Sequence, residues 1–256
     1  MPKISAVIIT LNEEKYIEAC LRSLAGVADE IIVVDSFSTD STEKICKDFN
    51  VKFHRHTFTG FRDQKNYAAS LALNNYILSL DADEALSDEL QKSILEEKDK
   101  MKLDGYYFNR LNNFCGQWIR HSAWYPDRQL RLFNREKGMW GPLNVHETFR
   151  MLPVSTTGRL KGDILHLAHG SVAELAGKIN YYSGIAAEEY FKAGKRVPLF
   201  APVLHLVWRF IVNYFFHLGF LDGRNGLIVC YLGAWSSYLK YSKLRKLNRE
   251  TIKKKG

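Results

Sequence analysis

The chain has 256 residues, of which 46% are hydrophobic and 25% charged, and this composition excludes disordered, collagen-like and low-complexity proteins. Its four cysteines lie far apart without a C-x-x-C pair, which excludes a disulfide scaffold or zinc ribbon and fits a reducing compartment. The formal net charge is +8, but the last 17 residues carry +7 of it, so no nucleic-acid partner is expected for the nearly neutral remainder.

Strand-like and helix-like segments alternate through the first hundred residues. Short apolar runs predict four strands of a buried sheet, at residues 4–10, 31–34, 51–53 and 76–80. Helical patterns follow these strands at residues 12–26, 41–49, 63–73 and 87–101. Asn12 is expected to cap the first helix. The alternation is typical of an α/β domain in which a parallel sheet is flanked by helices.

Polar side chains stand where three of these strands end: the segment 10–13, then Asp35, then Asp81 and Asp83. Ligands of open α/β sheets bind beyond the carboxyl ends of the strands, so these side chains are the candidates for a site. The chain has neither a G-x-G-x-x-G motif after the first strand nor a G-x-x-x-x-G-K-[ST] motif. Asp81 and Asp83 instead predict a Mg²⁺ or Mn²⁺ ion that neutralises phosphates. The alternative is that Asp-x-Asp forms a solvated turn that caps the next helix.

Four motifs follow one another along the first 90 or so residues: Thr-Leu-Asn-Glu-Glu at 10–14, the segment 33–42, Gln-Lys-Asn at 64–66 and Leu-Asp-Ala-Asp at 80–83. In this order and spacing they resemble family 2 glycosyltransferases. The resemblance implies the GT-A fold, a nucleotide-sugar-binding α/β domain, which we expect over residues 1–170. Further on, the motifs at 131–133, 140–141 and 145–147 resemble the branch that builds lipopolysaccharide cores, including core β-1,4-glucosyltransferases.

The resemblance also implies roles for single residues in binding the nucleotide sugar. Thr10, Leu11, Glu13 and Asp35 match the positions that contact the uridine or its ribose. Lys65 matches the basic position near the nucleobase, where Lys keeps the charge of the more frequent Arg but loses its planar fork.

Three residues are implied to bind the metal. Asp83, with Asp81 beside it, matches the acidic motif that holds the cation and the donor diphosphate, and Asp83 thereby takes part in catalysis. His166 is a candidate third ligand; as imidazole it is a less natural partner for Mg²⁺ than oxygen, and an ordinary core or surface histidine is the alternative.

Inverting sugar transfer needs a group that takes the proton of the acceptor hydroxyl. Glu147 lies where related enzymes carry the carboxylate that serves as this base, and His146 would orient it or touch a phosphate. The alternative interpretation makes Glu147 an ordinary surface carboxylate.

The region 171–256 is expected to be helical and to associate with a membrane. Beyond Pro202 the sequence is apolar and aromatic, with one polar stripe formed by His205, Arg209, Asn213 and His217, each four residues after the last. A second apolar stretch at 227–239 precedes the basic tail.

Three arrangements of this region compete. Arg209 and the two histidines disfavour a transmembrane helix, and a second option is a hairpin buried against the catalytic domain or in a dimer. A hairpin embedded in one leaflet fits best, because the basic tail then meets anionic lipid. Removal of the residues after Leu239 is therefore expected to release the protein from anionic vesicles.

The sequence thus predicts a metal-dependent, inverting bacterial glycosyltransferase peripheral to the cytoplasmic face of the inner membrane. It would move a hexose, with glucose favoured, from a UDP-sugar to a lipid-linked saccharide, the lipopolysaccharide inner core. The alternatives are sugar transfer to a polyprenyl phosphate, which needs no base because the nucleophile is already an anion, and a non-catalytic membrane-tethered scaffold.

Overall fold

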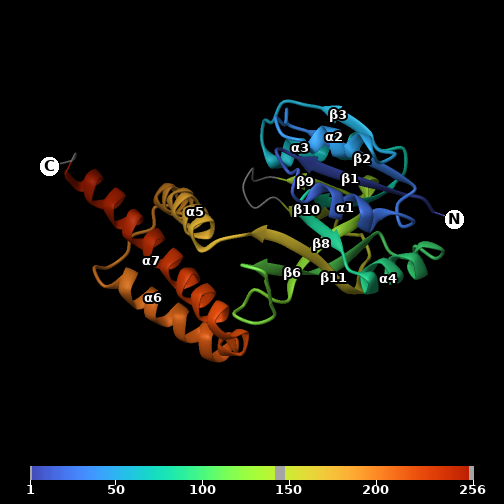
Figure 1. The fold of residues 1–256 in the computed structure, drawn as a ribbon. Helices are drawn as coiled ribbons and strands as arrows, with labels where there is room; N and C mark the ends of the chain where they lie inside the picture. Colours follow the sequence, from blue (N-terminus) through green and yellow to red (C-terminus); the bar gives the residue numbers. More distant parts are fainter. Residues whose placement is uncertain (1, 142–147, 254–256) are drawn as a thin grey trace. The chain divides into compact units, whose positions relative to one another are not determined.

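A computed structural model describes residues 2–141 and 148–253, which form two compact units (Figure 1). The first unit comprises Met1–Leu111 and Asp127–Leu167, and the second comprises Asn112–Pro126 and Ala168–Gly256. The excursion Asn112–Pro126 therefore belongs with the C-terminal helices.

The first unit is built on one sheet, and one half of that sheet consists of parallel strands. Its strands occur in the order β3-β2-β1-β4 and are β1 (Ile4–Thr10), β2 (Glu30–Asp35), β3 (Lys52–Arg55) and β4 (Tyr76–Asp81). The strands predicted from the apolar runs are confirmed. Burial on both faces explains the near-continuous hydrophobic sequences of β1, β2 and β4, whereas β3, at the edge of the sheet, is partly exposed.

The other half of the sheet is antiparallel. It continues from β4 in the order β8-β6-β11-β5. These strands are β5 (Glu84–Leu86), β6 (Gly105–Phe114), β8 (Asp127–Asn134) and β11 (Thr157–His169). After the 3₁₀ turn η1 (Arg135–Lys137), a separate two-stranded sheet pairs β9 (Gly138–Gly141) with β10 (Thr148–Met151).

Helices cover both faces of this sheet: α1 (Ile17–Leu24), α2 (Thr42–Lys47), α3 (Phe61–Ser70) and α4 (Asp88–Lys98). Side chains alternate along a strand, so β1 feeds two cores. Ile4 and Ile8 pack in one core with α1, α2 and α4, whereas Val7 packs in the other with α3 and the β9–β10 pair.

The predicted cap of the first helix is wrong. Asn12 has a positive φ of 56°, and its side-chain oxygen accepts a hydrogen bond from the Thr39 amide at 2.8 Å. The helix begins only at Ile17 and has no side-chain cap. Asn12 therefore ties two loops together instead of starting a helix.

The second unit consists of helices and a short β-hairpin. The end of β6 pairs with β7 (Gln117–Ile119). The helical elements are α5 (Val172–Lys192), α6 (Ala201–Ile211), the π-helical turn η2 (Val212–Phe216), the 3₁₀ turn η3 (Gly219–Asp222) and α7 (Gly223–Lys253). Phe114 and Ile119 of the hairpin share a core with Leu175 of α5 and Val229 and Leu232 of α7.

Two glycines allow the chain to turn between α6 and α7. A Cβ at Gly226 would lie 2.0 Å from the carbonyl oxygen of Gly219, and a Cβ at Gly219 would lie 2.4 Å from Cys230 Sγ. Leu218 before them adopts a left-handed conformation. The helices then lie side by side (Figure 1).

No single helix of the described residues has the length and apolarity to cross a membrane. The bent pair Ala201–Phe216 and Gly219–Glu250, with an angle of 74° between its parts, meets those two criteria jointly.

The apolar stretch at 227–239 and the basic residues that follow it, as far as Lys253, form one continuous helix, α7. Lys243 Nζ donates to the Asn180 side-chain oxygen and to Ser183 Oγ on α5, each at 2.9 Å, and Arg245 donates to the Leu199 carbonyl at 3.1 Å. A cut after Leu239 would remove these contacts as well as the charge, so it would not test electrostatic attraction alone.

Candidate functional site

The loops after β1 and β2 are held together at the carboxyl edge of the sheet. The amide of Asn12 donates to Ser38 Oγ, and the amide of Glu13 donates to Thr42 Oγ1, both at 2.8 Å. Asp40 accepts from the Glu14 amide at 3.1 Å. Short polar side chains make these cross-links because they reach neighbouring backbone groups. The result is a fixed rim beside Thr10 and Asp35.

Thr10 and Asp35 are direct neighbours across the β1–β2 pair. Asp35 is only 1% exposed and accepts a hydrogen bond from the Ser38 amide at 2.8 Å and another from the Ser38 hydroxyl. Thr10 is 5% exposed, and its hydroxyl finds no hydrogen-bond partner within residues 2–141 and 148–253. A buried hydroxyl of this kind is available to a ligand.

Asp81 ends β4 between two cations. Lys65 Nζ lies 3.0 Å from Asp81 Oδ1, and Arg131 Nη2 lies 3.0 Å from Asp81 Oδ2. Burial alone would raise the pKa of Asp81, but the charges of Lys65 and Arg131 outweigh it and hold that pKa well below its usual range. Asp81 is therefore ionised at neutral pH.

A buried charge network extends from Asp81 along the antiparallel half of the sheet. Arg131 also lies 2.9 Å from Glu84, which is fully buried, and Arg110 lies 3.3 Å from Glu84 and 2.7 Å from Asp127. Sequence analysis missed Glu84 and Arg110. The available signal was a charged residue inside an apolar strand run, as at Arg131 between Leu130 and Leu132.

The Gln-Lys-Asn motif of α3 anchors its own helix while it presents Lys65. Buried Gln64 lies 2.9 Å from His56 Nδ1, and Asn66 exchanges two 3.1 Å hydrogen bonds with the backbone of Trp140. Lys65 Nζ lies 4.7 Å from the centre of the Trp140 ring, within range of a cation–π contact. The side chain of Lys65 is thus fixed from both sides.

Asp83 and His166 meet because β5 pairs with β11. The register sets His166 opposite Glu84, and the Leu167 amide donates to the Asp83 carbonyl at 2.9 Å. His166 Nε2 lies 3.4 Å from Asp83 Oδ2, and both side chains are partly exposed. An oxygen ligand and a nitrogen ligand therefore converge at the rim of the sheet.

Asp83 and His166 fit a divalent cation whose remaining ligands a bound diphosphate would supply. Magnesium is commonly bound through one or two carboxylates together with substrate phosphates and water. The described part of the chain has no group of three or more His, Cys, Asp or Glu side chains arranged for a metal. Asp81 already faces two cations, so Asp83 is the carboxylate better placed for this role.

The structure therefore brings Thr10 next to Asp35, Lys65 next to Asp81, and Asp83 next to His166. Leu11 is half exposed on the loop after β1. The predicted base, Glu147, lies outside the described residues, as does His146. Its assignment stays a prediction.

Comparison with known proteins gives three kinds of similarity. The family model described as "Glycosyl transferase family 2" matches residues 5–155. An uncharacterized glycosyltransferase of Rickettsia typhi is 30% identical over 258 residues, covering 97% of this chain and 88% of that protein. The lipopolysaccharide core biosynthesis glycosyltransferase LpsC of Rhizobium meliloti is 28% identical, covering 94% of this chain and 95% of that protein.

A solved structure is similar along almost the whole length. It is the mannosyltransferase PcManGT from Pyrobaculum calidifontis in complex with GDP-Man and Mn²⁺, with a TM-score of 0.54 and 16% identity. The match covers 96% of this chain and 87% of that chain. The predicted GT-A fold, with helices after the α/β domain, is confirmed.

Proposed function

Because the chain belongs to glycosyltransferase family 2, as its motifs predict, we propose that it transfers a hexose, glucose as first candidate, from a UDP-sugar to a lipid-linked saccharide. The proposed acceptor is the inner core of lipopolysaccharide, and the similarity to LpsC supports it. The observation that carries the proposal is the arrangement at the carboxyl edge of β1, β2 and β4. There Asp83 and His166 lie 3.4 Å apart, and the neighbouring Asp81 is paired with Lys65 and Arg131.

We assign the uridine and ribose to the rim formed by the loops after β1 and β2. The hydroxyl of Thr10 and the carboxylate of Asp35 offer a donor and an acceptor on adjacent strands. Leu11 and Glu13 lie on the same loop. Lys65, fixed between Asp81 and Trp140, supplies positive charge next to the nucleotide.

Asp83 and His166 would hold Mg²⁺ or Mn²⁺. When bound, the cation offsets the charge that develops on the departing UDP. Asp81 would take part by holding Lys65 and Arg131 in place, so that their charges also face the diphosphate. Glu147 would accept the proton of the attacking hydroxyl.

We further propose that the protein works at the cytoplasmic face of the inner membrane, where its acceptor is anchored. Large apolar side chains on α6 and the following turns support this, since Trp208, Phe216 and Leu221 are 64%, 72% and 57% exposed. The second unit carries 15 lysines and arginines against five aspartates and glutamates, a formal +10, whereas the first unit has 21 against 23. Attraction to anionic lipid follows from this partition.

The proposal is tested by measuring UDP release from a panel of nucleotide sugars with a defined lipopolysaccharide-core acceptor, with and without Mn²⁺. We expect release from a UDP-hexose that needs the acceptor and the metal. Asp83→Asn should abolish it, whereas Asp48→Asn, at an exposed position, should retain it. Transfer only to a polyprenyl phosphate, or UDP binding without release under any acceptor, would contradict the proposal in favour of the alternatives.

A further inference from the structure

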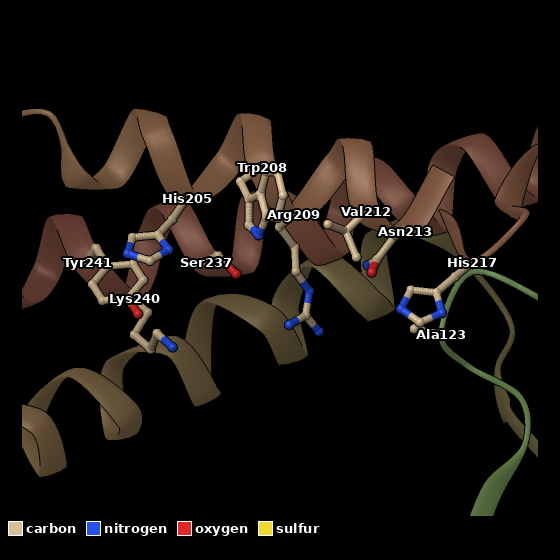
Figure 2. A pocket seen from close by; sticks show the side chains of 10 residues that line it. All are labelled: Ala123, His205, Trp208, Arg209, Val212, Asn213, His217, Ser237, Lys240 and Tyr241. Carbon is tan, nitrogen blue, oxygen red and sulfur yellow. The ribbon is translucent and has the colours of Figure 1, made fainter. Parts of the chain in front are cut away.

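A groove runs along α6 and α7 within the second unit (Figure 2). It encloses about 270 Å³, and the polar stripe of α6 lines it. The lining residues are Ala123, His205, Trp208, Arg209, Val212, Asn213, His217, Ser237, Lys240 and Tyr241. The stripe therefore forms a distinct surface of the second unit, and no carboxylate is among its lining residues.

Two cationic side chains, Arg209 and Lys240, line this groove. The Arg209 guanidinium and the Lys240 ammonium point to the same side of the helices, and His205 and His217 lie towards opposite ends (Figure 2). Neither Arg209 nor Lys240 forms a salt bridge with a carboxylate in the described part of the chain. Their charge is available for an anion from outside.

Aromatic rings hold the Lys240 end of the groove in place. His205 stacks on Tyr241 with 4.0 Å between ring centres. Lys240 Nζ lies 4.6 Å from the same Tyr241 ring and 4.7 Å from the ring of Tyr190. The lysine ammonium has three N–H groups, so contacts with two rings leave at least one for a further acceptor.

Apolar side chains border the cationic lining. Leu204, Val207 and Trp208 are 64%, 48% and 64% exposed on α6. A charged cleft beside exposed apolar surface complements a molecule with an anionic head and a hydrocarbon tail. Free inorganic phosphate would use the charges but not this apolar border.

We propose that the groove binds the phosphate headgroup of an anionic membrane lipid, with Arg209 and Lys240 as its charge partners and Asn213 and Ser237 as neutral hydrogen-bonding groups. This rests on the membrane association proposed above but on no step of sugar transfer. The groove would then give the second unit a specific lipid contact in addition to its diffuse charge.

The test uses the full chain, without donor or acceptor, and vesicles of phosphatidylcholine with or without phosphatidylglycerol. The double variant R209Q K240Q is compared with R224Q K246Q, which removes the same charge from exposed positions of α7 that do not line the groove. We expect the groove variant to bind anionic vesicles about tenfold more weakly than the control variant, because it loses charge-assisted hydrogen bonds as well as charge. Equal losses would overturn the proposal and leave only diffuse attraction.

Two further arms keep the test decisive. Short-chain phosphatidylglycerol below its micelle concentration should compete with vesicles for the wild type, whereas inorganic phosphate should compete far less; equal competition would overturn the assignment to a lipid. If the double variant fails to fold, K240Q is compared with K246Q. Because vesicle binding needs no turnover, failure of the proposed transfer reaction would leave these outcomes unchanged.

Discussion

Asp81 and Asp83 lie two residues apart yet have different surroundings. Asp81 faces Lys65 and Arg131, whereas Asp83 faces His166. The sequence predicted both as ligands of one cation, with Asp83 as the one that takes part in catalysis. Their surroundings instead support a division in which one carboxylate orders positive charge and the other is placed for a metal.

Replacement of Asp81 by Asn should destabilise the chain in a pH-dependent way. It leaves Lys65 and Arg131 without their shared carboxylate, at a cost of about 3 kcal/mol at pH 7. The folded-state pKa of Asp81 is lowered, so its stabilisation is present above the unfolded pKa of about 3.9 and is lost as the pH falls through the folded value. The difference in unfolding free energy between wild type and variant, measured by urea unfolding, should therefore begin to shrink below about pH 4.

Asp48→Asn is the control, because this carboxylate is exposed and forms no salt bridge within residues 2–141 and 148–253; its effect should stay within about 0.5 kcal/mol. A difference between Asp81→Asn and wild type that is the same at pH 7 and at acid pH would contradict the ion-pair explanation.

Glu147→Gln should lower transfer by roughly 10²–10⁴-fold, because the acceptor hydroxyl loses its base. UDP affinity should be nearly unchanged, since the proposed uridine contacts lie on the loops after β1 and β2. Steady-state kinetics and UDP titration separate the two effects. Glu136→Gln, at an exposed position of η1, serves as the control. Near-normal turnover of Glu147→Gln would rule out this base and favour an acceptor that is already an anion.

Among the secondary-structure elements, the strands that are buried on both faces could be predicted from the sequence. The strands β1, β2 and β4 are apolar along their length because both faces are covered, so their sequences alone predicted them. Ser87 was expected to begin a helix, and it accepts from the Leu90 amide as the cap of α4.

The antiparallel half of the sheet was not predicted in this way. The strands β6 and β8 carry the charged residues Arg110 and Arg131. Their charges are compensated by Glu84 and Asp127, which lie on other strands. The sequence of a single strand does not show which distant carboxylate neutralises its arginine. The charge network could therefore be seen only once the strands were paired.

The turn between α6 and α7 makes a prediction at this scale. Gly226→Ala should cost about 1–3 kcal/mol, because the added methyl group would overlap the Gly219 carbonyl oxygen. Gly177→Ala, inside α5 with nothing within 4 Å of the added Cβ, should instead gain up to about 1 kcal/mol of helix stability. Urea unfolding followed by tryptophan fluorescence measures both. A neutral Gly226→Ala would show that α6 and α7 can separate at the turn without cost.

At the scale of the whole molecule, the two units differ in charge, +10 against −2. The sequence predicted a basic tail. In the structure the described part of that tail, as far as Lys253, belongs to α7, and the helical unit that contains it carries +10. Two of its cations donate to other elements of the second unit: Lys243 to Asn180 and Ser183 on α5, and Arg245 to the Leu199 carbonyl. Only the remaining exposed charges are available to a membrane surface.

Binding to anionic vesicles should therefore fall steeply as ionic strength rises. Replacing Lys246 and Arg249, both exposed on α7, by Gln should weaken binding by up to about 1 kcal/mol each at low salt. Replacing Lys44 and Lys100, exposed in the first unit, removes the same charge and should have little effect. Co-sedimentation at several salt concentrations decides the matter, and salt-independent binding would refute an electrostatic contribution.

The excursion Asn112–Pro126 has a practical consequence for dissecting the gene. Arg110 and Asp127 are paired across β6 and β8, so a short engineered turn after Leu111 could replace the excursion. It would remove the end of β6 that pairs with β7 and keep the part that pairs with β8. A fragment that joins 2–111 to 127–167 through such a turn would omit the aromatic helices and suit crystallisation with donors. Simple truncation after residue 167 would instead remove the helices that pack against Phe114 and Ile119. The hairpin would then expose these apolar side chains and favour aggregation.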